Sequence, residues 1–158
     1  MTLSDAAAGA AASGLCTAHP SGSGLRLDVA NNLAATALVL EAVRDHLAAH
    51  SVGERGIYNS ELLIEELFTN TVRHGYNGDG AHRISIRIDV AADAISFEFD
   101  DDAKEFDPTL QAAPPAFQSL EDAPIGGLGL PLVRKMAQSM VYRRSSGHNL
   151  LSIRIANN

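Results

Sequence analysis

Three groups of residues in this chain have types and spacings that could do chemistry. The first is Glu66 with Asn70, which lie four positions apart in a segment of helical periodicity, so both project from one helix face. His74 follows one turn later on that face, with Arg73 beside it. Because the other positions carry apolar residues for the core, this polar face either meets solvent or lines a site. The other two groups must decide between these interpretations.

The second group is a run of three acids, Asp100, Asp101 and Asp102, directly after an alternating segment typical of a strand. A carboxylate at a strand end can accept a hydrogen bond from the exocyclic amine of adenine. Three adjacent acids can also supply the oxygen ligands that Mg2+ prefers, or they can form a solubilising turn. The run alone does not distinguish these roles.

The third group is glycine-rich: Gly126, Gly127 and Gly129 open an apolar segment that we expect to be helical. Glycines allow close backbone approach, and the free N–H groups at a helix start favour anions, so a phosphate cradle is one interpretation. A flexible hinge is the other. The segment is not a Walker A loop, because Leu130 and Pro131 stand where lysine and a hydroxyl residue are needed.

The first elements that must position these groups are predicted by periodicity. Residues 25–30 alternate like a short strand, and Asn31 or Asn32 can cap the helix that follows. We expect His46 and His50, near the end of that helix, to face solvent. The helix has a stripe of apolar residues at helical spacing for the core, which comprises Leu33, Ala37, Leu40, Val43 and Leu47.

The helix that carries Glu66 is predicted to begin at a cap, Asn59 or Ser60, and to run to about His74. Gly75 stands where a left-handed C-terminal cap belongs. Residues 84–90 and 95–99 then alternate as a hairpin with one buried face.

The second half of the chain is predicted to contain a long loop, a helix and a closing hairpin. Residues 100–125 are acidic and interrupted by prolines, and we interpret this stretch as a lid. A helix is expected from the glycines to about residue 140, with Pro131 tolerated in its first turn. Residues 141–144 and 149–155 complete the chain as a hairpin.

Composition limits the classes of function. With 158 residues, the chain can build one hydrophobic core, which we place in residues 25–158, and residues 1–24 are expected to be a disordered tail of small residues. A net charge of -7 with 12 scattered Lys and Arg argues against a nucleic-acid surface. No stretch suits a membrane span. Cys16 is the only cysteine, which excludes an intrachain disulfide and favours a cytoplasmic location.

Taken together and in this order, the three groups resemble the nucleotide site of the GHKL ATPases, and more closely that of the anti-sigma factor serine/threonine kinases of the RsbW type. The similarity spans about residues 25–155 and is strongest at 65–76, 106–108 and 125–135. The resemblance implies an α/β (α+β) two-layer sandwich, in which a mixed, mostly antiparallel sheet has helices on one face. It also implies ATP and Mg2+ held between the helices and a lid.

Roles for individual residues follow from the resemblance. It makes Glu66 the general base, Asn70 the Mg2+ ligand and Asp101 the reader of adenine. Gly127 and Gly129 would face the phosphates, and Ser152 matches a small hydroxyl residue near the base. The remaining nucleotide-binding positions implied are Arg73, His74, Ala103, Gly126, Leu128 and Leu130.

Two features depart from the family pattern and leave two functions open. Ala103 stands where the family commonly has glycine, and Glu105 where it often has glycine or proline. In addition, no Lys or Arg lies between Glu105 and Val133 to serve the γ-phosphate. One function is a kinase that binds a sigma factor and phosphorylates its antagonist protein. The alternative is a nucleotide-dependent interaction module without kinase activity. Family members commonly form homodimers. A third reading, a domain that binds no nucleotide, treats all three groups as surface features.

Overall fold

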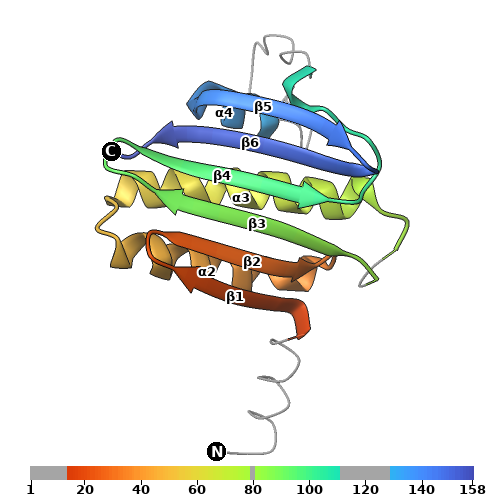
Figure 1. Cartoon of the computed structure of the whole chain (residues 1–158), viewed down its shortest axis with the longest axis horizontal. Helices are drawn as coiled ribbons and strands as arrows, with labels where there is room; N and C mark the ends of the chain where they lie inside the picture. The colour runs from red at the N-terminus through yellow and green to blue at the C-terminus, as the bar shows by residue number, and fades with distance from the viewer. Residues whose placement is uncertain (1–13, 79–80, 111–128) are drawn as a thin grey trace, which may run out of the picture.

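The computed structural model describes residues 14–78, 81–110 and 129–158. A six-stranded sheet forms one layer, and the helices lie together behind it as the second layer (Figure 1). The elements in chain order are β1 (Cys16–Ser21), β2 (Gly24–Ala30), the short 3-10 helix η1 (Leu33–Ala35), α2 (Thr36–Ala49), α3 (Glu54–Gly75), β3 (Arg83–Val90), β4 (Ala94–Asp101), the 3-10 helix η2 (Pro108–Leu110), α4 (Gly129–Met136), β5 (Ala137–Ser145) and β6 (His148–Ala156).

The strand order is β1-β2-β3-β4-β6-β5, and every neighbouring pair is antiparallel. In Figure 1, α2 lies behind β1 and β2, α3 behind β3 and β4, and α4 behind β5 and β6. The predicted two-layer class is therefore confirmed. The parallel pairing implied by a mixed sheet is absent from the described ranges, because hairpins or antiparallel returns connect all six strands. In these ranges no helix is long and apolar enough to cross a membrane.

The core lies between the two layers and follows from the alternation seen in the sequence. On β3, Ile84, Ile86 and Ile88 point to the helices and are buried, whereas Arg87 on the other face is exposed. Each such isoleucine contributes about 1.5–3 kcal/mol relative to an exposed position. The apolar residues of α3 that pack against the strands are Ile57, Leu63, Ile64, Leu67, Phe68 and Val72.

Residues 16–21 are not part of a disordered tail, as the sequence suggested, but form the edge strand β1. Its register on β2 begins with Cys16 opposite Val29. The strand has few apolar side chains, so its pattern in the sequence is weak, and its backbone pairing with β2 holds it in place. The Arg83 guanidinium adds to this hold, because Nη1 donates to the Gly14 carbonyl at 2.9 Å and Nη2 donates to the Asp28 carbonyl at 2.8 Å. Residues 1–13 lie outside the described ranges.

The first helix differs from its prediction at both ends. Asn32 caps η1 by accepting a hydrogen bond from the Ala34 N–H, and it does not cap α2 directly. Leu33 is exposed, and the buried residues of α2 include Val39, Val43 and Leu47. His46, expected in solvent, is also buried, with 8% of its surface exposed, and its Nε2 lies 3.0 Å from the carbonyl of Ser23 between β1 and β2.

The boundaries of α3 and α4 also correct the sequence interpretation. The helix α3 begins at Glu54, so Ser60 lies inside it and donates to the Gly56 carbonyl at 2.7 Å. Gly75 is its last residue and does not have a positive φ. Instead, a Cβ at Gly75 would stand 2.7 Å from the Ala103 Cβ, so close packing explains the glycine. The helix α4 ends at Met136 rather than near residue 140, because β5 already begins there.

Candidate functional site

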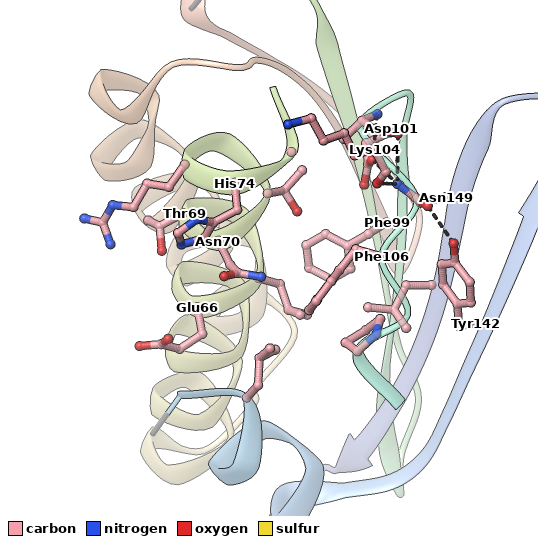
Figure 2. A pocket seen from close by; sticks show the side chains of 18 of the residues that line it. Glu66, Thr69, Asn70, His74, Phe99, Asp101, Lys104, Phe106, Tyr142 and Asn149 are labelled. Carbon is pink, nitrogen blue, oxygen red and sulfur yellow. Dashed lines mark hydrogen bonds between the residues drawn. The ribbon is translucent and has the colours of Figure 1, made fainter. Parts of the chain in front are cut away.

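A cavity of about 490 Å3 opens between α3, α4 and the neighbouring ends of β4 and β6 (Figure 2). This volume falls in the range of small-molecule sites in proteins, roughly 300–1,000 Å3. All three sequence groups contribute to its walls. The predicted site residues that line it are Glu66, Asn70, Arg73, His74, Asp101, Ala103, Gly129 and Leu130.

Ser152 is a correction to the predicted site. It was expected near Glu66, but it is exposed on β6 and faces away from the helices. Strand alternation is the reason, because Leu151 and Ile153 take the inward positions on either side of it, and Leu151 lines the cavity. Gly126, Gly127 and Leu128 lie outside the described residues, as does most of the predicted lid, residues 111–125.

The polar face of α3 forms one wall of the cavity. Glu66 and Asn70 are half-buried and lie one turn apart, with Thr69 and His74 on the same wall (Figure 2). Arg73 also lines the cavity. The core-facing residues Leu67 and Phe68 are buried against the sheet and fix the rotation of the helix. The polar stripe of α3 therefore lines a site rather than facing solvent alone.

The start of α4 is in close contact with Glu66. A Cβ built on Gly129 would collide with the Glu66 carboxylate and would stand 2.6 Å from its Cγ. With any other residue at position 129, the Glu66 side chain would have to move. The contact brings Gly129 and Glu66 together, and both line the cavity with Asn70.

Asp101 lies at the opposite end of the cavity, where β4 finishes. Only 7% of it is exposed, and its Oδ1 accepts hydrogen bonds from the Ala103 N–H at 3.0 Å and from Asn149 Nδ2 at 2.8 Å. Burial raises the pKa of this carboxyl above its ordinary value, although the two hydrogen bonds partly offset that effect. A buried carboxylate with an ordered orientation is suited to recognising a polar group of a ligand.

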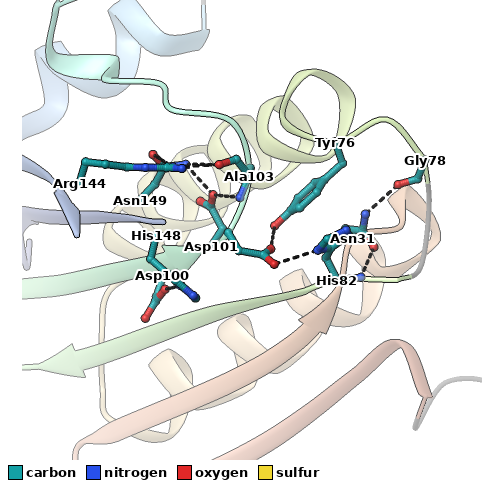
Figure 3. Close-up of polar contacts among 11 residues, drawn as sticks. Asn31, Tyr76, Gly78, His82, Asp100, Asp101, Ala103, Arg144, His148 and Asn149 are labelled. Atoms are coloured by element: carbon teal, nitrogen blue, oxygen red, sulfur yellow. Dashed lines mark hydrogen bonds and ion pairs between the residues drawn. The ribbon is translucent and has the colours of Figure 1, made fainter. Parts of the chain in front are cut away.

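Asn149 and Tyr142 are site residues that the sequence reasoning missed. Asn149 on β6 pairs with Asp101 on the neighbouring strand β4 (Figures 2 and 3). The Tyr142 hydroxyl donates to Oδ1 of Asn149 at 2.7 Å (Figure 2). Both line the cavity. A signal was available for Asn149, because it occupies the inward phase of β6 that otherwise holds Leu151 and Ile153. A polar residue in an apolar phase is expected to have a buried partner.

The three consecutive acids point in three directions and do not share a site. Asp100 pairs with His148 at 2.6 Å on the exposed face of the sheet, while Asp101 faces the cavity. Asp102 accepts from the Tyr76 hydroxyl at 2.9 Å and lies 2.8 Å from His82 Nδ1 (Figure 3). The Mg2+ site that the run could have formed is therefore not present. Across the described ranges, no three His, Cys, Asp or Glu side chains come together as metal ligands.

Lys104 supplies a cation that the sequence reasoning did not consider. It immediately precedes the stretch without Lys or Arg and lines the cavity, as does Arg73 on α3. Its backbone N–H donates to the Gly75 carbonyl at 3.1 Å, which ties the segment after β4 to the end of α3. The site thus has positive side chains on two of its walls.

The chain is similar to known proteins in sequence and in structure. Residues 29–155 match the family model described as a histidine kinase-like ATPase domain. Over 112 residues, the chain is 31% identical to the serine/threonine-protein kinase BtrW of Bordetella bronchiseptica, which covers 71% of this chain and 75% of that protein. A histidine kinase domain from a blue-light activated histidine kinase of Erythrobacter litoralis aligns with a TM-score of 0.45 and 16% identity, covering 78% of this chain and 60% of that chain.

Proposed function

The chain belongs to the histidine kinase-like ATPase domain family, and from this premise we propose that it is an ATP-dependent protein kinase of the anti-sigma factor type. It would bind a sigma factor and transfer the γ-phosphoryl group of ATP to a serine or threonine of an antagonist protein. The observation that carries the proposal is the meeting of Glu66, Asn70, Asp101 and Gly129 in one cavity.

The arrangement of the cavity supports an orientation for the nucleotide. Asp101 at the end of β4 would accept a hydrogen bond from the 6-amino group of adenine. The phosphates would extend toward Asn70 and the start of α4, where the glycine allows close backbone approach and helix N–H groups favour anions. Lys104 and Arg73 would add positive charge along the way.

The donor set also fits a magnesium ion bound together with ATP. Mg2+ in nucleotide sites usually takes one or two protein ligands and fills its other positions with phosphate oxygens and water. The side-chain oxygen of Asn70, a residue that lines the cavity, would be the protein ligand. When bound, the ion would neutralise charge on the phosphoryl oxygens.

Glu66 would take the proton that the proposed reaction releases. In the proposed step, the oxygen of the partner's hydroxyl bonds to the γ-phosphorus, the bond to the β-phosphate oxygen breaks, and ADP leaves. The hydroxyl proton passes to the Glu66 carboxylate, which acts as general base. Its contact with Gly129 would hold that carboxylate beside the phosphate end of the cavity.

The test is a phosphorylation assay with purified candidate antagonist proteins and Mg-ATP, read by mass spectrometry of the modified hydroxyl. Glu66→Gln should lower the rate by about a hundredfold or more, because general-base catalysis typically contributes at least that factor. Glu65→Gln is the matched control, since Glu65 is the neighbouring, exposed acid on α3 and does not line the cavity. If wild type and Glu66→Gln gave equally negligible amounts of phosphorylated product, the proposed kinase activity would be refuted.

A second candidate function is a nucleotide-dependent interaction module without phosphoryl transfer. The observation that favours it is the absence of Lys and Arg from residues 106–132, the stretch that precedes and opens α4. In this case ATP would change the affinity for a sigma factor or antagonist without being consumed. Partner capture that is the same with and without Mg-ATP would count against it.

A further inference from the structure

We propose that Asn149 and Arg144 are positioning residues that fix the orientation of Asp101 and so make the site selective for a purine with a 6-amino group. The inference rests on the proposed nucleotide function and goes beyond it by assigning roles to two residues of the closing hairpin. Neither residue needs to touch the nucleotide. Their effect passes through the hydrogen bonds shown in Figure 3.

The amide of Asn149 can adopt only one of its two orientations. Arg144 Nη1 lies 2.8 Å from the Asn149 oxygen, and a guanidinium can only donate, so the amide oxygen must face Arg144. The Tyr142 hydroxyl donates to the same oxygen at 2.7 Å. On the other side, Nδ2 faces acceptors, namely Asp101 Oδ1 at 2.8 Å and the Lys104 carbonyl at 3.0 Å.

A reversed amide would be strongly disfavoured. Its oxygen would then face the Asp101 carboxylate and a backbone carbonyl, while its NH2 would face the guanidinium of Arg144. Asn149 is buried, with 6% exposed, so such mismatches cannot be relieved by water without cost. Arg144 on one side and the acceptors around Nδ2 on the other therefore determine together which group Asn149 presents to Asp101.

The orientation of the Asn149 amide determines which oxygen of Asp101 can bind a ligand. Its Oδ1 accepts from two donors, Asn149 Nδ2 and the Ala103 N–H, and the carboxylate plane is fixed by them. Oδ2 is then the oxygen left to accept a hydrogen bond from a ligand in the cavity. An acceptor held rigidly in a buried place favours an amino group and leaves a base without that group unpaired.

Arg144 also fixes the segment beside the site. Besides Asn149, its Nη1 donates to the Ala103 carbonyl at 2.9 Å, while the Ala103 N–H donates to Asp101. Ala103 in turn packs against Gly75 at the end of α3. The guanidinium therefore joins β5, β6 and the residues after β4 into one unit around the Asp101 carboxylate.

The test compares binding of ATP with binding of purine riboside triphosphate, which has the same phosphates but no 6-amino group. Wild type should prefer ATP by about ten- to a hundredfold, as expected for a hydrogen bond to a charged group. In Asn149→Ala the preference should fall to about threefold or less. Binding of the purine analogue should change little, because the phosphate end of the cavity is intact.

A merely structural role predicts a different result, since a loosened fold would weaken both nucleotides equally and keep the ratio. That outcome would overturn the inference. Arg144→Met, which removes the charge but leaves Asn149, should also lower the ratio and covers the case in which Asn149→Ala does not fold. Asn157→Ala removes another side-chain amide, which donates to Ala91 at 2.7 Å at the opposite end of the sheet, and should leave both affinities unchanged.

The same measurements separate this inference from the proposed function. Wild type that binds neither nucleotide would refute nucleotide binding, and the inference with it. Wild type that binds ATP with the expected preference, together with Asn149→Ala and Arg144→Met variants that keep that preference, would refute the inference alone.

Discussion

The carboxylate of Glu66 lies against the backbone of Gly129, so closely that a Cβ at position 129 would overlap the carboxylate in its present place. We expect Gly129→Ala to push the Glu66 side chain out of place. Because Glu66 is a flexible side chain, the fold should survive with a thermal midpoint within a few degrees of wild type. Phosphoryl transfer should fall by about tenfold or more, as for a displaced general base. Rates and melting curves of the same preparation test this.

Gly78→Ala is the control for that variant, because nothing lies within 4 Å of a Cβ at Gly78 and its φ is not positive. It should change neither the rate nor the melting midpoint by more than the error of measurement. A Gly129→Ala protein with full activity would show that the contact with Glu66 has no role in the reaction.

Asp101→Asn is expected to separate stability from ligand binding. An asparagine can still accept from Asn149 and Ala103 through its oxygen, but it places an NH2 group where adenine needs an acceptor. ATP affinity should fall by about ten- to a hundredfold. Burial raises the pKa of the Asp101 carboxyl, so its charge opposes folding at neutral pH, and the neutral variant should melt at a higher temperature.

Asp93→Asn is the matched control, since Asp93 is an exposed acid at the other end of β4 and pairs with Arg154 at 3.1 Å. Exposed pairs contribute little, so neither affinity nor stability should change appreciably. Calorimetry of ATP binding and thermal unfolding at pH 7 give both quantities. An Asp101→Asn variant that binds ATP normally would remove Asp101 from the nucleotide site.

Because His46 is buried, we expect the folded protein to lose stability in mild acid. Its Nε2 lies 3.0 Å from the Ser23 carbonyl, and burial lowers its pKa, with the nearby His50 acting in the same direction and Asp89 opposing it. The unfolded chain, with an imidazole pKa of about 6.5, then binds the proton more tightly than the folded one. The contribution of His46 to stability is therefore fully present above the pKa of the unfolded chain. It declines as the pH falls toward the lowered pKa of the folded state.

The measurement is the free energy of unfolding in urea between pH 7.5 and 5. His46→Gln keeps a donor for the Ser23 carbonyl but cannot titrate, so its stability should decline less over this range. His19→Gln, on the exposed strand β1, serves as the control and should follow wild type. Equal slopes for wild type and His46→Gln would contradict the prediction.

We expect the contacts of Asp102 to stabilise the segment that connects α3 and β3. The hydrogen bond with His82 lowers the Asp102 pKa, so the interaction stabilises the fold above the unfolded value of about 3.9 and is lost below the lowered folded value. At neutral pH, Asp102→Asn should speed amide exchange at Asn77, Gly78 and His82. Global stability should change little because the pair is exposed.

Asp100→Asn is the control for this variant, because Asp100 pairs with His148 at similar exposure but on the other face of the sheet. Its exchange rates at residues 76–78 and 81–82 should match those of wild type. Faster exchange there in both variants would mean that loss of charge, rather than the contact with His82 and Tyr76, is responsible.

The sequence predicted the elements whose signals are local. The isoleucines of β3 and the alternation of β4 identify that hairpin without reference to any other part of the chain. The helical spacing of Glu66 and Asn70 similarly placed both on one face. The family resemblance grouped that face with Asp101 and Gly129, and all four residues line one cavity. These features depend on the pattern of a single segment or on a shared motif.

Features that depend on distant partners were not predictable in this way. Residues 16–21 become a strand because β2 offers an edge, and few of their side chains signal it. The inward phase of β6, which excludes Ser152 and recruits Asn149, is decided by its pairing with β4. Likewise, the close contact of Glu66 with Gly129 follows from how α4 packs on α3, which no local pattern encodes.

The divergence of Asp100, Asp101 and Asp102 has a consequence for how this segment can change over time. Three chemically identical residues have three different partners, so position along the backbone, and not residue type, assigns each its task. An inserted or deleted residue within β4 would preserve the composition of the run yet present an outer-face acid to the cavity. Such length changes should be eliminated by selection here, whereas exchanges of amino acid at Asp100 should be accepted.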